Sequence, residues 1–318
     1  MSILYSGDST TINAFENKNY ICDLIILGKP DQPEMYYLRD ILEKIKKNKS
    51  YSNSARFTFK IEFETQFNNT FHELLKNNVD FVKYQNESPI IYNNTNKDEQ
   101  KIDIIGDFKE FIEYITINFS YSDEFNYDKY FKISKELYKN YIKNSPNKYA
   151  FINLSSFDNK KSNNMIVFEL YLETCYKSVM NFLELCKGNI KNKGNEILSY
   201  KNCEVFRIAK NGFIQSGDLS NFKGSKCIFG SKFEDENYDI KHDVNGVIGY
   251  VKENGKKHSN ECQFYITLNP LKCFDKKFVA FGRVIMGYGV IERLTEVDCF
   301  MQRPVNKVTI VNCGEYLG

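Results

Sequence analysis

The stretch FRIAKNGFIQSGD, residues 206–218, contains a turn signal between two runs that alternate like β-strands. The Asn-Gly pair at 211–212 tolerates positive φ at both positions, and between apolar runs it predicts a β-hairpin. A hairpin centred there places Arg207 across from Gln215. Because residues two apart on a strand share a face, Phe213 lies beside Gln215. We therefore predict a small surface with one guanidinium, one carboxamide and one aromatic ring.

Taken alone, this pattern is more typical of an arginine on an ordinary exposed strand, so the rest of the chain has to decide. Further short strands are predicted through the second half of the chain: YAFINL (149–154), MIVFELYL (165–172), ILSYKNCEVFRIA (197–209), GFIQSGD (212–218), GVIGYV (246–251), CQFYITLN (262–269), FVAFGRVI (278–285) and NKVTIVNC (306–313). Amphipathic helices are predicted over 174–189 and 288–296. For residues 148–318 we predict an eight-stranded antiparallel β-barrel with two helices.

Residues 1–119 show a different order of predicted elements, β-α-β-α-β-β-α. The elements are, in order, 20–27, 33–47, 55–63, 70–77, 88–93, 101–105 and 107–115. This order resembles the thioredoxin or glutaredoxin fold, and the resemblance places Pro89 at its cis-proline and Gly106-Asp107 at the start of its last helix. We predict an N-terminal α/β thioredoxin-like domain over 1–119 and a helical connector over 120–147, with its helix at 125–144.

The first loop of this predicted domain lacks the residue that thiol chemistry requires. A thioredoxin-like oxidoreductase needs a cysteine of low pKa at the start of its first helix. Here that loop is GKPDQPEM (28–35), and Cys22 lies inside the preceding predicted strand, where it is typical of core. We therefore predict a domain without a C-x-x-C motif, which serves as a binding domain or a spacer and does not transfer electrons.

The composition excludes several classes of function. The chain has 318 residues, a formal net charge of +2 and no basic block, which argues against a nucleic-acid surface. It has no apolar run of about 18 residues, as a membrane span would need, and MSILYSGDST lacks the features of a signal peptide. We expect a cytoplasmic protein that does not use a membrane. Nine cysteines without a C-x-x-C pair and three scattered histidines predict reduced thiols, no metal site and no cofactor.

Several motifs in the second half occur together, in order and at consistent spacing: IVFELYLETCYKSVMNFLELCKGN (166–189), VFRIAKNGFIQSGD (205–218), GSKCIFGSKFEDENYDIKH (224–242), NGVIGYV (245–251), CQFYITLN (262–269) and KKFVAFGRVIMGYGVIERL (276–294). From about 148 to 316 the chain resembles the cyclophilins. It most resembles the peptidyl-prolyl isomerase-like six subfamily, whose members carry an extra N-terminal thioredoxin-like domain.

The resemblance implies a peptidyl-prolyl cis-trans isomerase that acts on X-Pro bonds in protein substrates and assists folding. Resonance opposes rotation of an amide bond by about 18–20 kcal/mol. Lowering that barrier requires a pocket for the proline ring and donors that stabilise the twisted amide, with no nucleophile, metal or base. In the resemblance Arg207 falls on the catalytic arginine, and Gln215 and Gln263 fall on pocket glutamines. Tyr265 falls on the pocket phenylalanine, and we predict an isomerase that uses these residues.

Other pocket positions depart from the family. The departures are Gly212-Phe213 for Phe-Met, with Phe213 as a substitute floor, Lys252 for the pocket Asn, Cys273 for the pocket Trp, Phe274 for a Leu and Phe278 for the pocket His. The proline ring should still find aromatic walls, but the loss of the indole N–H predicts weak binding of cyclosporin-type ligands. The departures leave open an alternative: a catalytically weak module that binds proline-containing peptides or proteins.

Two other motifs resemble ligand-binding sequences, one for a nucleotide and one for a metal ion. GYGVIE (287–292) begins like a nucleotide-binding loop, but Glu292 would repel a pyrophosphate, so we predict a turn followed by a helix. The acids of FEDEN (233–237) lack metal-ligand spacing, and we interpret them as a solvated loop with helix-capping roles. Thiol chemistry remains a third hypothesis only if a single cysteine such as Cys273 has a depressed pKa.

Overall fold

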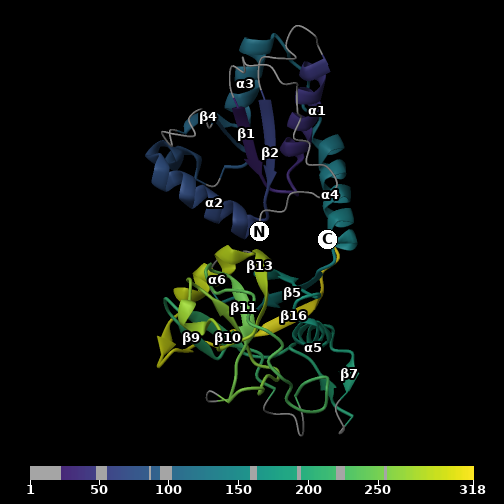
Figure 1. The fold of residues 1–318 in the computed structure, drawn as a ribbon, viewed down its shortest axis with the longest axis vertical. Coiled ribbons are helices and arrows are strands. Elements are labelled where there is room, and N and C mark those ends of the chain that lie inside the picture. Colours follow the sequence, from purple (N-terminus) through teal and green to yellow (C-terminus); the bar gives the residue numbers. More distant parts are fainter. Residues whose placement is uncertain are drawn as a thin grey trace. The chain divides into compact units, whose positions relative to one another are not determined.

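The computed structural model describes residues 23–47, 56–85, 87–93, 102–157, 163–191, 195–219, 226–253 and 256–318. The chain divides into two compact units, Met1–Tyr141 and Ile142–Gly318 (Figure 1). The predicted core position of Cys22 lies outside the described residues.

Unit 1 is a four-stranded mixed sheet covered by helices. Its strands are β1 (Asp23–Gly28), β2 (Arg56–Ile61), β3 (Ile90–Asn93) and β4 (Asp103–Asp107), in the order β2-β1-β3-β4. β1 and β2 are parallel, and the other pairs are antiparallel. The helices are α1 (Pro33–Lys47), α2 (Glu64–Asn77), the 3-10 helix η1 (Val79–Tyr84), α3 (Phe108–Phe119) and α4 (Tyr127–Asn144). The predicted β-α-β-α-β-β-α order is therefore present.

Alternation along β1 distributes the core of unit 1 to both faces of the sheet. Leu24 and Ile26 pack in one cluster with α1 and α3. Leu27 packs in the other cluster with α2 and η1. Because side chains on a strand alternate between faces, one apolar strand can support helices on both sides. Figure 1 shows α1 and α2 on opposite sides of this sheet.

The start of α3 follows the predicted N-cap. The Asp107 side chain accepts from the Glu110 N–H at 3.0 Å, and the Glu110 carboxylate accepts from the Asp107 N–H at 3.2 Å. This reciprocal pair is a capping box, which satisfies two helix-terminal donors. The Ser88–Pro89 peptide bond is cis.

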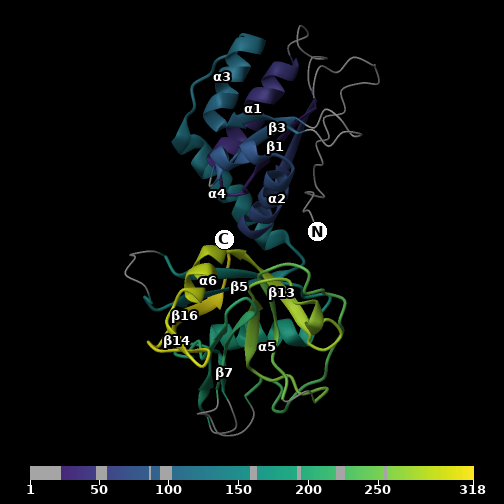
Figure 2. The ribbon, with the colours of Figure 1, turned by 90° about the vertical axis from the view of Figure 1, so that its left-hand side faces the viewer.

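Unit 2 is built on an eight-stranded antiparallel sheet with strand order β16-β5-β6-β13-β11-β12-β10-β9. In chain order the strands are β5 (Lys148–Leu154), β6 (Met165–Leu170), β9 (Arg207–Ala209), β10 (Phe213–Ser216), β11 (Val247–Tyr250), β12 (Phe264–Thr267), β13 (Ala280–Met286) and β16 (Ile310–Glu315). The predicted helices are α5 (Tyr176–Lys187) and α6 (Tyr288–Thr295), and α6 begins after the Gly287 turn as expected. Figure 2 shows α5 and α6 with this sheet.

The edge strands of the sheet are β16 and β9, and the irregular segment before β9 forms backbone hydrogen bonds with the start of β16 and the residues before it. The Ile310 N–H donates to Cys203 O at 2.9 Å, and the Val205 N–H donates to Val308 O at 2.8 Å. The predicted antiparallel sheet of eight strands is confirmed, and its curled form brings its two edge regions together.

One predicted strand is wrong in its extent. The sequence predicts a single strand over 197–209, but the structure has only β8 (Ile197–Leu198) and β9 within it. Between them Asn202 has a φ of 71°, and the Cys203 N–H donates to Tyr200 O at 3.0 Å. A left-handed residue and a turn hydrogen bond interrupt the extended backbone. Two short hairpins complete unit 2: β7 (Ile190–Lys191) with β8, and β14 (Cys299–Phe300) with β15 (Arg303–Pro304).

Candidate functional site

The hairpin predicted from residues 206–218 is present. β9 and β10 pair antiparallel, with Arg207 opposite Gln215 and Ala209 opposite Phe213. Asn211 has a φ of 69°, and the Gly212 N–H donates to Ala209 O at 2.8 Å, which closes the turn. The local turn chemistry therefore sets the register that brings the guanidinium and the carboxamide to neighbouring strands.

Arg207 lies exposed between two side chains. Its Nε donates to Oε1 of Gln302 at 2.7 Å, and its guanidinium carbon lies 5.0 Å from the centroid of the Phe213 ring. A guanidinium over an aromatic ring is attracted by the ring quadrupole. Sequence reasoning missed Gln302, which lies on the turn between β14 and β15, because that turn is far from Arg207 in sequence.

The two predicted glutamines contact each other. The Nε2 of Gln215 donates to Oε1 of Gln263 at 3.2 Å. Gln215 is buried and Gln263 is half-buried, and the Gln263 backbone oxygen accepts from the Val251 N–H at 2.9 Å. Each carboxamide retains further donor and acceptor capacity, so the pair could bind the backbone of an extended peptide.

Four predicted aromatic residues form one cluster, which we call the aromatic cluster: Phe213, Tyr265, Phe274 and Phe278. Ring centroids of Phe213 and Phe274 are 5.5 Å apart, and those of Phe274 and Phe278 are 4.6 Å apart. All three phenylalanine rings lie 5.2–6.2 Å from the ring of Tyr265. Tyr265 is only 1% exposed. Its neighbours therefore cover the ring that the resemblance assigns as the wall of the proline pocket.

The hydroxyl of Tyr265 is held by a buried histidine. His242 Nε2 lies 2.7 Å from that hydroxyl oxygen, and His242 Nδ1 lies 2.9 Å from Oδ1 of Asp275. Burial lowers the pKa of the His242 imidazole, although the bond to Asp275 opposes this shift. Burial raises the pKa of the Tyr265 phenol well above its usual value. The three residues form a hydrogen-bonded chain from the surface of unit 2 to the aromatic cluster.

Gly249 leaves the space that this tyrosine needs. It lies opposite Tyr265 in the β11–β12 register. A Cβ at Gly249 would lie 2.2 Å from the Tyr265 hydroxyl oxygen, a separation that packed atoms do not tolerate. The hydroxyl of Tyr265 is thus accommodated by a glycine on the neighbouring strand.

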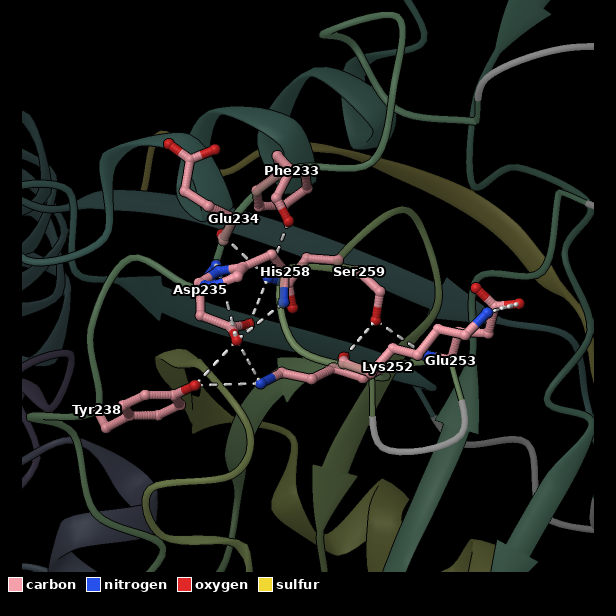
Figure 3. Close-up of polar contacts among 10 residues, drawn as sticks. Phe233, Glu234, Asp235, Tyr238, Lys252, Glu253, His258 and Ser259 are labelled. Carbon is pink, nitrogen blue, oxygen red and sulfur yellow. Dashed lines mark hydrogen bonds and ion pairs between the residues drawn. The ribbon is translucent and has the colours of Figure 1, made fainter.

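Lys252 is held in a buried ion pair and does not project freely into a groove (Figure 3). Its Nζ lies 2.8 Å from Oδ2 of Asp235, and the two side chains are 4% and 2% exposed. The same ammonium lies 5.2 Å from the Tyr238 ring centroid and 6.0 Å from that of Phe278. Lys252 therefore connects the FEDEN loop to the aromatic cluster.

The interpretation of the FEDEN acids as a solvated loop is wrong for Asp235. Asp235 also accepts from Tyr238 Oη at 2.9 Å and from Asn260 Nδ2 at 2.9 Å. Burial raises the pKa of the Asp235 carboxyl, but Lys252 and its other donors together hold that pKa below its usual value. The capping role is confirmed for Glu236, whose carboxylate accepts from the N–H groups of Lys177 and Ser178 at 2.7 and 2.8 Å, at the start of α5.

Cys273 lies exposed on the short 3-10 helix η2 (Lys272–Phe274), next to the aromatic cluster. Within the residues that the structure describes, no three His, Cys, Asp or Glu side chains are grouped as metal ligands. No helix in the described ranges has the length and apolar character to cross a membrane.

Comparison with known proteins identifies what unit 2 is similar to. The family model described as "Cyclophilin type peptidyl-prolyl cis-trans isomerase/CLD" matches residues 156–315. "Probable inactive peptidyl-prolyl cis-trans isomerase-like 6" of Homo sapiens is 41% identical over 153 residues, 47% of this chain and 49% of that protein. The Bos taurus protein of the same description is 40% identical over the same shares. "NK-tumor recognition protein" of Mus musculus is 38% identical over 162 residues, 49% of this chain and 11% of that protein.

The match to the isomerase-like 6 proteins spans about half the length of each of these relatives. Their printed descriptions contradict the prediction that this chain is a peptidyl-prolyl cis-trans isomerase assisting protein folding. In this chain Tyr265, which the family resemblance assigns to the pocket, is 1% exposed, and its hydroxyl is hydrogen-bonded to His242.

Proposed function

The chain belongs to the cyclophilin-type peptidyl-prolyl cis-trans isomerase family, and we propose that unit 2 binds proline-containing segments of other proteins with weak or no turnover. The observation that carries this proposal is the burial of Tyr265, which is 1% exposed beside the exposed Arg207. The ring at the assigned pocket position is covered, while the half-buried Phe213 and the exposed Arg207 remain accessible.

Binding and turnover make different demands on such a site. Turnover requires interactions that are stronger with the twisted amide than with the planar one. Binding requires only a surface that fits the segment, and proline-rich segments dock on aromatic surfaces flanked by hydrogen-bond donors. The half-buried Phe213 and Phe274 supply rings, and Arg207 and the Gln215–Gln263 pair supply donors.

We also propose a finer assignment of the fold of each unit. We regard unit 2 as a closed barrel of the cyclophilin type, extending over 148–318. The strand order β2-β1-β3-β4 of unit 1 supports a thioredoxin-like domain over 1–119, followed by the connector 120–147. In this domain the loop before α1 carries no cysteine, so its role would be binding or spacing.

Exchange NMR tests the proposed function on short X-Pro peptides added to the full chain. We expect peptide resonances to shift while cis-trans exchange stays uncatalysed, with a time constant on the order of tens to hundreds of seconds. Arg207→Ala should weaken the shifts, and a matched peptide with Pro→Ala should bind more weakly. Exchange accelerated by the wild type, or shifts that do not depend on proline, would overturn the proposal.

A further inference from the structure

The β14–β15 hairpin and the residue that follows it present large apolar side chains to solvent. Phe300, Met301 and Val305 are 70%, 86% and 65% exposed, and we call them the apolar turn. Met301 and Gln302 have φ values of 45° and 67°, a left-handed conformation that non-glycine residues rarely adopt. Single exposed apolar residues are ordinary, but a group of them beside a binding surface indicates an interaction site.

Hydrogen bonds fasten the apolar turn to the candidate site. The Ile208 N–H on β9 donates to the Gln302 backbone oxygen at 2.7 Å. The neighbouring Arg207 Nε donates to the Gln302 side-chain oxygen, also at 2.7 Å. The same guanidinium lies over the Phe213 ring. Arg207 therefore links the apolar turn to the aromatic cluster.

The charge around the apolar turn is predominantly positive. Four cations lie along β9, its turn and the segment after β14: Arg207, Lys210, Arg303 and Lys307. The acids that flank these segments are Glu204, before β9, and Asp298, before β14. Glu204 is already shared by Arg303 and Lys307, at 3.0 and 2.7 Å. Positive potential on one partner favours acidic side chains on the other.

We propose that the bound proline-containing segment continues across the apolar turn, and that its preferred partner carries an apolar side chain and acidic residues beside the proline. This inference rests on the proposed function and adds the chemistry of the partner. The aromatic cluster would hold the proline, Arg207 would contact the backbone or a carboxylate, and Phe300 and Met301 would cover the apolar side chain.

Fluorescence anisotropy with labelled peptides tests this partner on the full chain. The probe peptide carries one proline, two glutamates and one leucine, in two versions with the leucine on either side of the proline. Matched peptides replace leucine by serine or proline by alanine. We expect one leucine version to bind about tenfold more tightly than its serine counterpart, which corresponds to about 1.4 kcal/mol.

Variants of the exposed turn make the test specific. Phe300→Ser with Met301→Ser should remove the tenfold preference for leucine and leave the affinity for the serine peptide unchanged. Leu317→Ser, at a site that is 66% exposed and far from the turn in sequence, should change neither affinity. Equal binding of leucine and serine peptides by the wild type would overturn the inference, as would a preference that survives the double substitution. If proline-to-alanine peptides bind as well as the probe, the proposed function fails separately.

Discussion

The Nε2 atom of His242 lies 2.7 Å from the hydroxyl oxygen of Tyr265, and both side chains are at most 1% exposed. Buried polar groups are almost always hydrogen-bonded because an unmade bond costs the full desolvation of the group. This pair therefore fixes the orientation of the Tyr265 ring beneath the three phenylalanines of the aromatic cluster. It also links that ring to Asp275, on the segment that follows η2.

Tyr265→Phe should destabilise unit 2. The substitution leaves one nitrogen of the buried His242 without its partner, at a cost of about 1–3 kcal/mol. Hydrogen exchange of the β10 and β12 amides, measured by mass spectrometry, reports the opening free energy of this sheet. Tyr176→Phe, at a residue that is 59% exposed, is the matched control and should change little. Equal exchange in the two variants would show that the hydroxyl bond contributes nothing to stability.

The buried imidazole predicts a pH dependence of stability. Burial lowers the pKa of His242 below its ordinary value of 6.5, against the opposing effect of Asp275 and Asp243 and with a smaller lowering by Lys241. The unfolded chain thus takes up a proton below pH 6.5 that the folded chain rejects. Stability should fall as the pH drops from 6.5 to the folded pKa, by at most about 1.4 kcal/mol per pH unit, and then level off.

Thermal unfolding followed by circular dichroism checks this window. The midpoint of the wild type should fall between pH 7 and pH 5, and His242→Gln should reduce that fall because an amide does not titrate. If the two proteins lose stability in parallel over this range, another group causes the dependence.

Lys252→Met should be among the most damaging single substitutions in unit 2. It leaves the Asp235 carboxylate, whose side chain is 2% exposed, without its cation. Removing one partner of a buried pair costs about 3–5 kcal/mol. Lys256→Met removes a surface cation 3.4 Å from Glu253, an exposed pair that contributes about 0–1 kcal/mol. Thermal midpoints of the two variants should differ accordingly.

A second substitution separates charge from packing at this site. Adding Asp235→Asn to Lys252→Met removes the uncompensated charge, and the new amide oxygen can still accept from one of the two donors, Tyr238 or Asn260, which bond different oxygens of the carboxylate. The double variant should therefore recover part of the lost stability. A double variant as unstable as Lys252→Met alone would mean that the lysine stem, and not the ion pair, supplies the stabilisation.

Local chemistry explains why the hairpin could be predicted from the sequence. An Asn-Gly turn between alternating runs is specified by neighbouring residues, so the register of Arg207 and Gln215 followed from the sequence. The strand predicted over 197–209 failed because the left-handed Asn202 interrupts it, and no strong local signal marks that turn. Local patterns set elements, whereas tertiary contacts decide where they end.

The partners within the site could not be predicted in the same way. His242 lies 23 residues from Tyr265, and Gln302 lies 95 residues from Arg207. Periodicity carries no information on contacts at such separations. One signal was present: a tyrosine at the position of a pocket phenylalanine needs a hydrogen-bond partner when buried. That requirement pointed to a nearby polar side chain without identifying it as His242.

Cys273→Trp should strengthen binding of cyclosporin-type ligands. In the family resemblance this exposed position corresponds to the pocket tryptophan, whose indole N–H such ligands use, and the wild type should bind them weakly. The chain contains no tryptophan, so the introduced indole would be the sole source of tryptophan fluorescence. A ligand-dependent change of that emission, together with calorimetry, measures the affinity.

Lys272→Trp, on the adjacent exposed residue, is the matched control and should show little change. Because Tyr265 stays covered in both variants, neither should accelerate prolyl exchange. Equal affinities of the two variants would mean that the covered aromatic cluster, and not the missing indole, limits ligand binding.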